Sequence, residues 1–595
     1  MHILLVASAF NSLTQRIYTE LAEHGHSLGV SLALGNDEEL REAVRRHAPD
    51  LIVAPMLTTA IPEDIWSRHT CLIVHPGPPG DRGPSSLDWA IAQDAPQWGV
   101  TVLEAVAEMD AGDVWAWRPL EVAPVGKSEL YRGEVADAAV AAVREAVERY
   151  ASRTHRPEKQ AAADLAAGWR CFMRQPERAI DWSRDSTAEV LRRLRAADSQ
   201  PGVLDELLGE RWYLHGGHAE TELRGVPGTL LATRDGAVCR ATVDGAIWLP
   251  HLRPVAAPGE PASFKRPAVD ALGARLPPLP EVPAGAQDWS EIRYEEQGDV
   301  GLLWWRFAGG AMGTAQCQRL LAAWRRACER PTRVLVFGSE RDFFSNGIHL
   351  NLIEAAADPA AESWANINAM NDLVQAILCT TDRLVVAALG GNAAAGGAML
   401  ALAADEVWCR EGAVLNPHYR LMGLHGSEYW TYTLPRRVGT AMAQQLTEAA
   451  LPLGAQRARA LGLVDRVLDV PPQGFGDAVR RLAATLAAGP GLRQRIAGKA
   501  GARARDEAAK PLQRYRDEEL AQMRRNFFEP GEPYHALRSA FVRKHKPACT
   551  PEHLAALGLN EPRAAQPLAA PALAEPQRVR AGLAGLLGRL AGAMR

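Results

Sequence analysis

The sequence lacks the patterns that would place the protein outside the cell or in a membrane. Its eight cysteines are scattered, with no CxxC pair and no Cys/His spacing typical of zinc, so we expect reduced thiols and no metal site. No stretch approaches ~20 uninterrupted apolar residues, which argues against a membrane span. The opening MHILLVASAF lacks the basic region and long apolar core of a secretion signal. We therefore expect a cytoplasmic protein.

A strong charge imbalance is lacking as well. The formal net charge of −4 gives no overall field favouring nucleic acid or anionic lipid, so we expect neither a nucleic-acid partner nor a membrane partner. No GxGxxG follows the first predicted strand, which argues against a dinucleotide-binding fold. The 595 residues are 47% apolar, enough for several domains of roughly 150 residues, each with its own core.

The first 160 residues alternate predicted strands and helices. Strands are predicted at His2–Ala7, Leu28–Leu34, Leu51–Pro55 and Cys71–Val74. Helices are predicted at Ser12–Glu23, Asp37–His47 and from Leu87 to Ala92. This alternation predicts an α/β fold with a parallel sheet covered by helices on both faces. Ligands bind beyond the carboxyl ends of such strands, so the loops after Ala7, Pro55 and Val74 are candidate sites.

The rest of the chain divides into four regions. Residues 161–265 carry a helix followed by HGG, RDG and VDG turns, which predicts a small β-rich domain. Residues 266–288 are rich in proline and alanine and predict a stiff linker. A second globular α/β unit is expected at 289–510, followed by a helical region at 511–595. Within that region, Glu575–Met594 indicates an amphipathic helix or a loose tail.

The most informative N-terminal stretch is IVHPGPPGDRGPSS, residues 73–86, followed by MDAGD at 109–113. A histidine ends a predicted strand, a Pro/Gly loop with RG follows, and an aspartate lies in a later D-x-G-D turn. This combination resembles the formyltransferases that use 10-formyltetrahydrofolate, over about residues 1–265. The tract Ile180–Gly202 resembles the start of the smaller C-terminal domain of methionyl-tRNA formyltransferase.

Formyl transfer passes through a tetrahedral oxyanion, which a charged His75 held by Asp110 can stabilise while relaying a proton. Asp113 is expected to shape the turn that receives the pterin ring, and Gln15 and Arg132 are candidate folate contacts. A lone histidine at a strand end is more often structural. The sequence also departs from the family at Ile73, where an asparagine normally binds the oxyanion, so a binding-only domain is the alternative.

Two glycine-rich segments carry the second resemblance. RDFFSNGIHL (341–350) and GGNAAAGGAMLALAAD (390–405) together resemble the crotonase, or enoyl-CoA hydratase/isomerase, family over about residues 290–510. The resemblance implies that the backbone N–H groups of Ile348 and Gly396 bind a thioester oxygen, because glycine allows close approach and a helix N-terminus adds positive charge. Small residues before a helix also occur for packing alone.

The crotonase-like half lacks the two glutamates that activate water in hydratases. Their positions hold Met399 and, approximately, His418, so hydration of an enoyl thioester is not expected. The segment NPHYRLMGLHGSEYW (416–430) offers other groups for proton transfer. The candidates are Tyr419 and Glu428, with His418 third and His425 nearby. Further on, FVRKHKP (541–547) is either a solvated basic face or a site for coenzyme A phosphates that includes Arg543.

The combination of the two halves resembles the HypX-type (HoxX) hydrogenase maturation proteins over nearly the whole chain. That resemblance implies two substrates, 10-formyltetrahydrofolate and coenzyme A, and possible contact with other hydrogenase maturation proteins. It also implies that formyl passes to coenzyme A and that formyl-CoA is split to carbon monoxide and coenzyme A. A thiol on a flexible pantetheine arm then needs a groove or cavity between His75 and Ile348. The alternatives are a formyl-CoA or acyl-CoA hydrolase and a non-catalytic scaffold.

Overall fold

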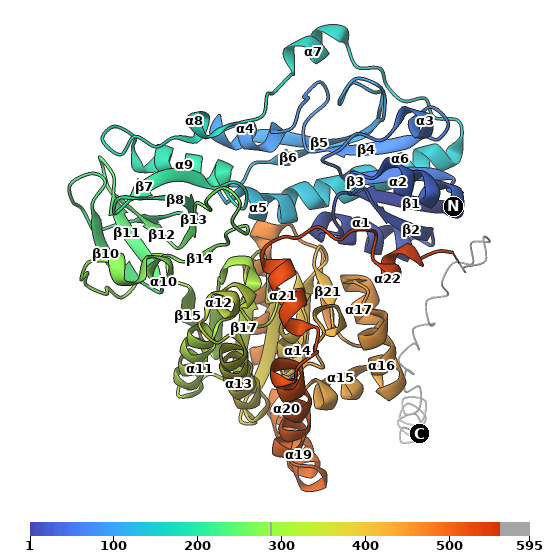
Figure 1. Ribbon diagram of the computed structural model, residues 1–595. Coiled ribbons are helices and arrows are strands. Elements are labelled where there is room, and N and C mark those ends of the chain that lie inside the picture. The colour runs from blue at the N-terminus through green and yellow to red at the C-terminus, as the bar shows by residue number, and fades with distance from the viewer. Residues whose placement is uncertain (286–287, 560–595) are drawn as a thin grey trace, which may run out of the picture.

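The computed structural model describes residues 1–285 and 288–559 (Figure 1). The N-terminal unit is built on a six-stranded sheet in the order β2-β1-β3-β4-β5-β6. Its strands are β1 (His2–Ala7), β2 (Ser27–Leu32), β3 (Leu51–Met56), β4 (Cys71–His75), β5 (Gln97–Glu104) and β6 (Val114–Glu121). Its helices are α1 (Ser12–Glu23), α2 (Asp37–His47), α3 (Glu63–Trp66), α4 (Ser86–Ala92), α5 (Lys127–Leu130), α6 (Ala136–Ser152) and α7 (Ala162–Ala167), with a π-helical turn at Tyr131–Val135. Strands β1 to β4 are parallel as predicted, whereas β5 and β6 are antiparallel.

Alternation along β1 shows why both faces of this sheet are covered. Ile3 and Leu5 pack in one cluster with α1 and α6, while Leu4 and Val6 pack in another with α2 and α3. Successive side chains on a strand point to opposite faces, so a fully apolar strand needs helices on both sides. The carboxyl ends of the parallel strands meet at one edge, where the loop after β4 begins at His75.

The small domain folds as two four-stranded antiparallel sheets, β10-β11-β12-β9 and β14-β13-β8-β7. The strands are β7 (Val203–Leu207), β8 (Glu210–His215), β9 (His218–Glu220), β10 (Leu230–Arg234), β11 (Ala237–Ala241), β12 (Ala246–Leu249), β13 (His251–Pro254) and β14 (Arg266–Pro267). The helices are α8 (Gln175–Arg178), α9 (Thr187–Ala197) and α10 (Ala268–Leu272). Strand β14 and helix α10 fall in the stretch expected to be a linker, and α10 packs into the core of this domain.

The C-terminal unit is a second layered α/β structure around the sheet β15-β16-β17-β18-β20-β23. Its strands are β15 (Ile292–Gln297), β16 (Val300–Trp305), β17 (Val334–Ser339), β18 (Leu384–Leu389), β20 (Glu406–Arg410) and β23 (Arg466–Leu468), with a small sheet of β19 (Ala393–Ala394), β21 (Val414–Asn416) and β22 (Leu453–Gly454). Its helices are α11 (Thr314–Cys328), α12 (Leu350–Ala355), α13 (Pro359–Leu378), α14 (Gly396–Leu402), α15 (Trp430–Val438), α16 (Thr440–Ala449), α17 (Ala455–Leu461) and α18 (Phe475–Ala488).

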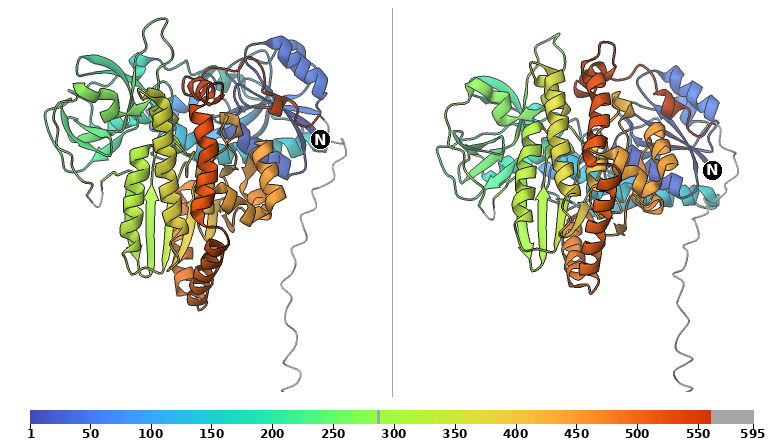
Figure 2. Two further views of the ribbon diagram at one scale, coloured as in Figure 1. Left: turned by 60° about the horizontal axis from the view of Figure 1, so that its bottom comes forward. Right: turned by 90° about the horizontal axis from the view of Figure 1, so that it is seen from below.

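The final helices are α19 (Leu492–Ala509), α20 (Leu512–Phe528), α21 (Tyr534–Val542) and α22 (Glu552–Ala555). Helices α11, α13 and α20 run side by side, in green, olive and red in Figure 2. The chain then returns to the N-terminal sheet, where Leu554 of α22 joins its core and the Thr550 hydroxyl accepts the N–H of Leu32 at 2.9 Å. The predicted tail segment at 575–594 lies outside the described residues.

Charged pairs join the N-terminal and C-terminal units. Arg132 donates to both carboxylate oxygens of Asp342, at 2.6 and 2.7 Å. Arg341 pairs with Glu134 at 2.6 Å. Bidentate arginine–carboxylate pairs fix orientation as well as distance, so these contacts set how the two units face each other.

Three features bear on the compositional expectations. All eight cysteines are free thiols. Within the described ranges no helix combines the length and apolarity needed to cross a membrane. Among the same residues no group of His, Cys, Asp or Glu side chains is arranged to hold a metal ion.

Candidate functional site

In the N-terminal unit His75 lies between two carboxylates. Its Nε2 is 2.8 Å from Asp81 Oδ2, and its Nδ1 is 3.5 Å from Asp110 Oδ2. The imidazole is 5% exposed and the Asp81 side chain 3%. The structure thus brings together the predicted pair and adds Asp81, which the sequence analysis missed although it lies only six residues after the histidine.

Two glycines allow this arrangement. A Cβ atom on Gly77 would lie 2.5 Å from His75 Nε2 and 2.3 Å from the Asp81 carboxylate, so no side chain fits there. Gly83 has a φ of +108° and donates its N–H to Asp110 Oδ2 at 3.0 Å. The Pro/Gly loop therefore positions both carboxylates, because each lies against a glycine that a larger residue could not replace.

Residues 168–170 lie along the outside of this loop. The N–H of Arg82 donates to the Gly168 carbonyl at 3.0 Å, and the N–H of Arg170 donates to the Arg82 carbonyl at 2.8 Å. The Arg170 guanidinium donates to Asp81 Oδ1 at 2.5 Å, leaving Oδ2 of that carboxylate for His75. The connection into the small domain thus holds the carboxylate that orients the imidazole.

Ile73 packs against the apolar cluster on the α2 and α3 side of the sheet, with Ile61 and Ile65 among its members. Its aliphatic side chain has no N–H to offer an oxyanion. Asp113 is half-buried just before β6, and its carbonyl accepts the N–H of Glu104 at 2.9 Å. It lies just beyond the Asp110 turn, where it was expected to shape the loop.

Gln15 and Arg132 lie at the boundary between the two units. The Gln15 side chain accepts from the Asn416 side chain at 3.0 Å and donates to the Phe10 carbonyl at 2.8 Å. Arg132 is held by Asp342 and stacks over Phe343 with 4.4 Å to the ring centre. Both therefore lie beside segments of the C-terminal unit, 416–430 for Gln15 and 341–350 for Arg132.

A cavity of about 940 Å³ opens where the N-terminal unit, the small domain and the C-terminal unit meet. Its cationic lining consists of Arg132, Arg195, Lys265, Arg306 and Arg341, together with Arg293 at one side. The lining also includes Ser128, Asp198, His215, His218, His251, Trp305 and Asp342. Neither His75 nor Ile348 lines it, but Arg132 and Asp342 do, so the cavity reaches the ion pair that joins the two units.

Burial lowers the pKa values of basic groups around this cavity. It lowers the pKa of Lys265, and it lowers the pKa of His218 and of His251 to about 3. With pKa values of about 3 these two imidazoles are neutral at pH 7, so the arginines carry the positive charge that faces the cavity. Arg543 stands outside this lining: it donates to the Glu354 carboxylate at 3.1 Å and to the Ala262 carbonyl at 3.3 Å, three residues before Lys265.

In the C-terminal unit the two glycine-rich segments come together. Short parallel bridges join Ser345 to Ala393 and Met312 to Ile348. A Cβ atom on Gly347 would lie 3.2 Å from the nitrogen of Gly396, the first residue of α14. Ala395, just before it, has a φ of +48°, a conformation that turns the chain sharply into the helix. Within the described residues neither the Ile348 nor the Gly396 N–H donates a hydrogen bond, as an oxyanion hole requires.

Glu428 lies against Gly396, one of these two residues. A Cβ atom on Gly396 would lie 2.2 Å from Glu428 Oε1, and the Tyr419 hydroxyl donates to Glu428 Oε2 at 2.7 Å. Burial raises the pKa of Glu428 to about 7, with the nearby Glu519 carboxylate adding to the rise. Burial, followed by the Glu428 charge, raises the pKa of Tyr419 well above its usual value. A carboxyl near neutrality is suited to accept and return a proton.

The backbone at Glu428 is strained and is held by side chains from two helices. Glu428 and Tyr429 have φ values of +62° and +58°, uncommon for residues with a Cβ. Asn371 of α13 accepts the Glu428 N–H at 2.8 Å, and Glu519 of α20 accepts the Tyr429 N–H at 2.9 Å. Glu519 also accepts the N–H of Thr431 at 2.9 Å.

Asn371 and Glu519 were missed because they lie far from Glu428 in sequence, on helices with no motif of their own. Burial raises the pKa of Glu519 to about 7. His418, the third candidate from sequence, has its pKa lowered to about 4 by burial and then by His553 of α22.

Comparisons with known proteins agree with the two sites. The formyl transferase family matches residues 10–147, its C-terminal domain matches 173–262, and the enoyl-CoA hydratase/isomerase family matches 312–548. The hydrogenase maturation factor HoxX of Bradyrhizobium diazoefficiens is 48% identical, over 93% of this chain and 96% of its own. A methionyl-tRNA formyltransferase of Myxococcus xanthus is 27% identical over 36% of this chain and 68% of its own.

The structure of HypX from Aquifex aeolicus in complex with tetrahydrofolic acid superimposes with a TM-score of 0.89. It is 41% identical and covers 95% of this chain and 99% of its own. The α/β architecture predicted from sequence is confirmed: a formyltransferase sheet with its β-rich domain, followed by a crotonase domain that ends in helices.

Proposed function

The chain belongs to the HypX/HoxX family of hydrogenase maturation factors, and on that premise we propose that it makes carbon monoxide from a folate-bound formyl group. The N-terminal half transfers formyl from 10-formyltetrahydrofolate to the thiol of coenzyme A. The C-terminal half splits formyl-CoA to CO and free coenzyme A, and the CO becomes a ligand of iron in [NiFe] hydrogenase.

The formyl-transfer step fits the surroundings of His75. The coenzyme A thiolate attacks the formyl carbon and a tetrahedral oxyanion forms, after which the bond to folate N10 breaks and N10 takes up a proton. His75, hydrogen-bonded to Asp81 and paired with Asp110, lies at the strand end where it can stabilise the oxyanion and supply that proton. The tetrahydrofolic acid in the related HypX structure supports folate as the donor.

The decarbonylation step rests on one observation, the carboxylate of Glu428 packed against the Cα of Gly396. A thioester oxygen bound by the Ile348 and Gly396 N–H groups would place the formyl hydrogen next to Glu428. Glu428 takes that proton, the C–S bond breaks with its electron pair on sulfur, CO leaves, and the proton passes from Glu428 to the thiolate. The step needs no oxidant or reductant. Tyr419 donates a hydrogen bond that steadies the carboxylate.

The cavity between the units supports coenzyme A as the shared carrier. Its volume of about 940 Å³ lies at the upper end for ligand pockets, and its lysine and arginine lining suits phosphates. Arg543 beside the 262–265 segment is a further candidate contact for phosphate, and Gln15, Arg132 and Asp113 remain candidate folate contacts at the unit boundary and the Asp110 turn.

Two variants divide the proposed sequence of steps. Glu428→Gln, incubated with 10-formyltetrahydrofolate and coenzyme A, should accumulate formyl-CoA without CO. His75→Asn should make no formyl-CoA from the folate yet release CO from formyl-CoA supplied directly. A haem protein traps and reports CO. Formate in place of CO would identify a formyl-CoA hydrolase, and formyl that stays on folate in the unaltered protein would identify a scaffold.

A further inference from the structure

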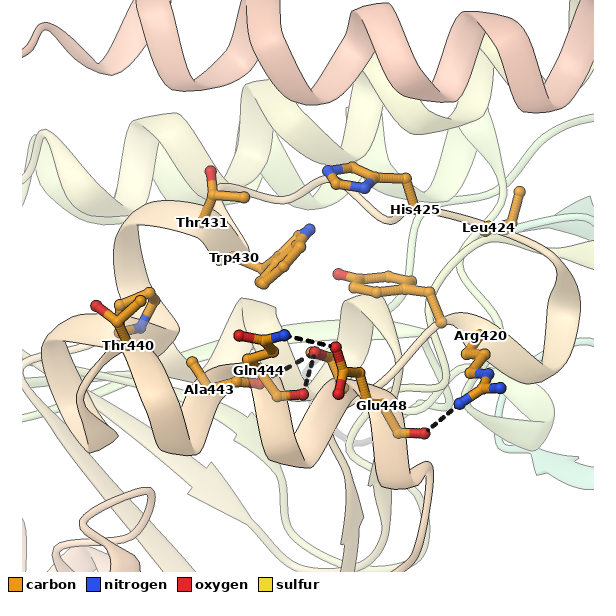
Figure 3. Close-up of a pocket in the computed structure, with 12 residues that line it drawn as sticks. Arg420, Leu424, His425, Trp430, Thr431, Thr440, Ala443, Gln444 and Glu448 are labelled. Atoms are coloured by element: carbon orange, nitrogen blue, oxygen red, sulfur yellow. Dashed lines mark hydrogen bonds between the residues drawn. The ribbon is translucent and has the colours of Figure 1, made fainter. Parts of the chain in front are cut away.

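A second hollow has Tyr419 among its lining residues, and neither Ile348 nor Gly396 lines it (Figure 3). It measures about 710 Å³ and lies between the 419–431 segment and α16. Figure 3 shows His425 and Trp430 on one side and Ala443 and Gln444 of α16 on the other.

The inner part of this hollow is apolar and the rim is polar. Tyr419 and Ala443 are buried, and Leu424 and Trp430 are half-buried. The exposed rim carries Arg420, Thr440, Gln444 and Glu448. Arg420 donates to the Glu448 carbonyl at 2.7 Å, and Gln444 donates to the Glu448 carboxylate at 2.7 Å, so the rim groups satisfy one another. An apolar interior with a self-paired polar rim suits an aliphatic chain rather than a charged ligand.

The Tyr419 side chain connects this hollow to the thioester site. The ring of Tyr419 lines the hollow, and its hydroxyl is bonded to Glu428, which lies against Gly396. The ring cannot swing aside easily, because a Cβ atom on Gly426 would lie 2.1 Å from its Cδ2. Gly426 thus packs directly on the ring, at a φ of +89° that favours glycine.

We propose that the Tyr419 ring restricts the thioester site to a one-carbon acyl group by closing it off from an apolar hollow large enough for a short aliphatic chain. This specificity role belongs to the ring and is separate from the hydrogen bond made by the hydroxyl. It rests on the proposed function in one respect, the placement of a thioester at Ile348 and Gly396.

Competition binding distinguishes the effect of the Tyr419 ring on acyl-chain selectivity from the effect of its hydroxyl. Acetyl-CoA and butyryl-CoA are titrated against radiolabelled coenzyme A bound to the full-length protein. In the unaltered protein and in Tyr419→Phe, butyryl-CoA should bind no more tightly than acetyl-CoA. In Tyr419→Ala the ratio of the affinity for butyryl-CoA to the affinity for acetyl-CoA should rise by roughly tenfold or more. Butyryl-CoA has two more methylene groups, and each buried methylene raises affinity about fourfold. The double variant Tyr419→Ala/Ala443→Phe refills the hollow and should lose the gain.

The proposal is overturned if Tyr419→Ala and Tyr419→Phe show the same ratio of butyryl-CoA to acetyl-CoA affinity. It is also overturned if the double variant keeps the raised affinity for butyryl-CoA. Unchanged affinity of Tyr419→Ala for coenzyme A itself, measured in the same titration, shows that the variant is folded. Failure of the decarbonylation mechanism gives a different pattern: Tyr419→Phe would release CO at the normal rate while the binding ratios still separate the two variants.

Discussion

Replacing Glu519 by glutamine should shift the pH dependence of CO release from formyl-CoA. Glu428, with its pKa at about 7 against an ordinary 4.5, is displaced by about 2.5 pH units, equivalent to about 3 kcal/mol against ionisation. If Glu428 is the base, only roughly 3% of it is ionised at pH 5.5, so the rate there should be about 30-fold below its plateau.

The Glu519 charge is one of the causes of that displacement, and burial is the larger one. Glu519→Gln removes the charge of Glu519 but leaves Glu428 buried. On the acid side of the pH–rate profile, the midpoint of the rise in rate (the acid limb) should therefore move from about pH 7 to a lower pH, without reaching 4.5. Glutamine keeps one carbonyl oxygen to accept a backbone N–H, so the plateau should fall less than it does in Glu428→Gln. The assay is single-turnover CO release into a haem protein across the pH range.

The matched control is Glu518→Gln, the neighbouring residue on α20. Glu518 is 61% exposed and pairs with Lys510, so the same loss of charge occurs in solvent. Its acid limb should coincide with that of the unaltered protein. If Glu519→Gln lowers the plateau but leaves the limb in place, Glu519 only supports the backbone and Glu428 is not the titrating base.

Three further predictions concern other parts of the molecule. Asp81→Asn should slow formyl transfer by roughly 100-fold while CO release from supplied formyl-CoA stays normal, because only the first step uses the His75 pair; equal loss of both would contradict this. Lys265→Met should weaken coenzyme A binding by roughly tenfold in calorimetry, whereas exposed Lys159→Met should not. Since Glu428 has a raised folded-state pKa, its contribution to stability is present below about pH 4.5 and is lost as pH rises through about 7. The melting temperature of Glu428→Gln should therefore rise relative to the unaltered protein between pH 5 and pH 8, and parallel curves would refute the assignment.

Short stretches of sequence predicted the strands and helices that have a clear apolar or amphipathic pattern of their own. The apolar strands β1, β3 and β4 and the helices α1 and α2 were expected nearly at their observed bounds. No strand was expected at the positions of β5 and β6, and strand alternation would not have revealed that they pair antiparallel. The 266–288 stretch was expected to be a linker because it is rich in proline and alanine, but β14 in it pairs with β13, and α10 in it buries apolar residues.

The same division holds for the sites. Asp110, Tyr419 and Glu428 lie in recognisable motifs, and the structure brings each to its expected neighbour. Asn371 and Glu519 act across long loops, and their partners are backbone N–H groups that carry no sequence signal. Such residues emerge only when the fold brings α13 and α20 to the same turn.

The central claim is that one formyl carbon passes from folate to coenzyme A and leaves as carbon monoxide within a single chain. The direct measurement follows ¹³C-labelled 10-formyltetrahydrofolate through one turnover of the full-length protein with coenzyme A. The account predicts one labelled CO for each folate consumed, with coenzyme A regenerated and no labelled formate. Label recovered as formate, or retained on folate while coenzyme A is bound, would contradict it.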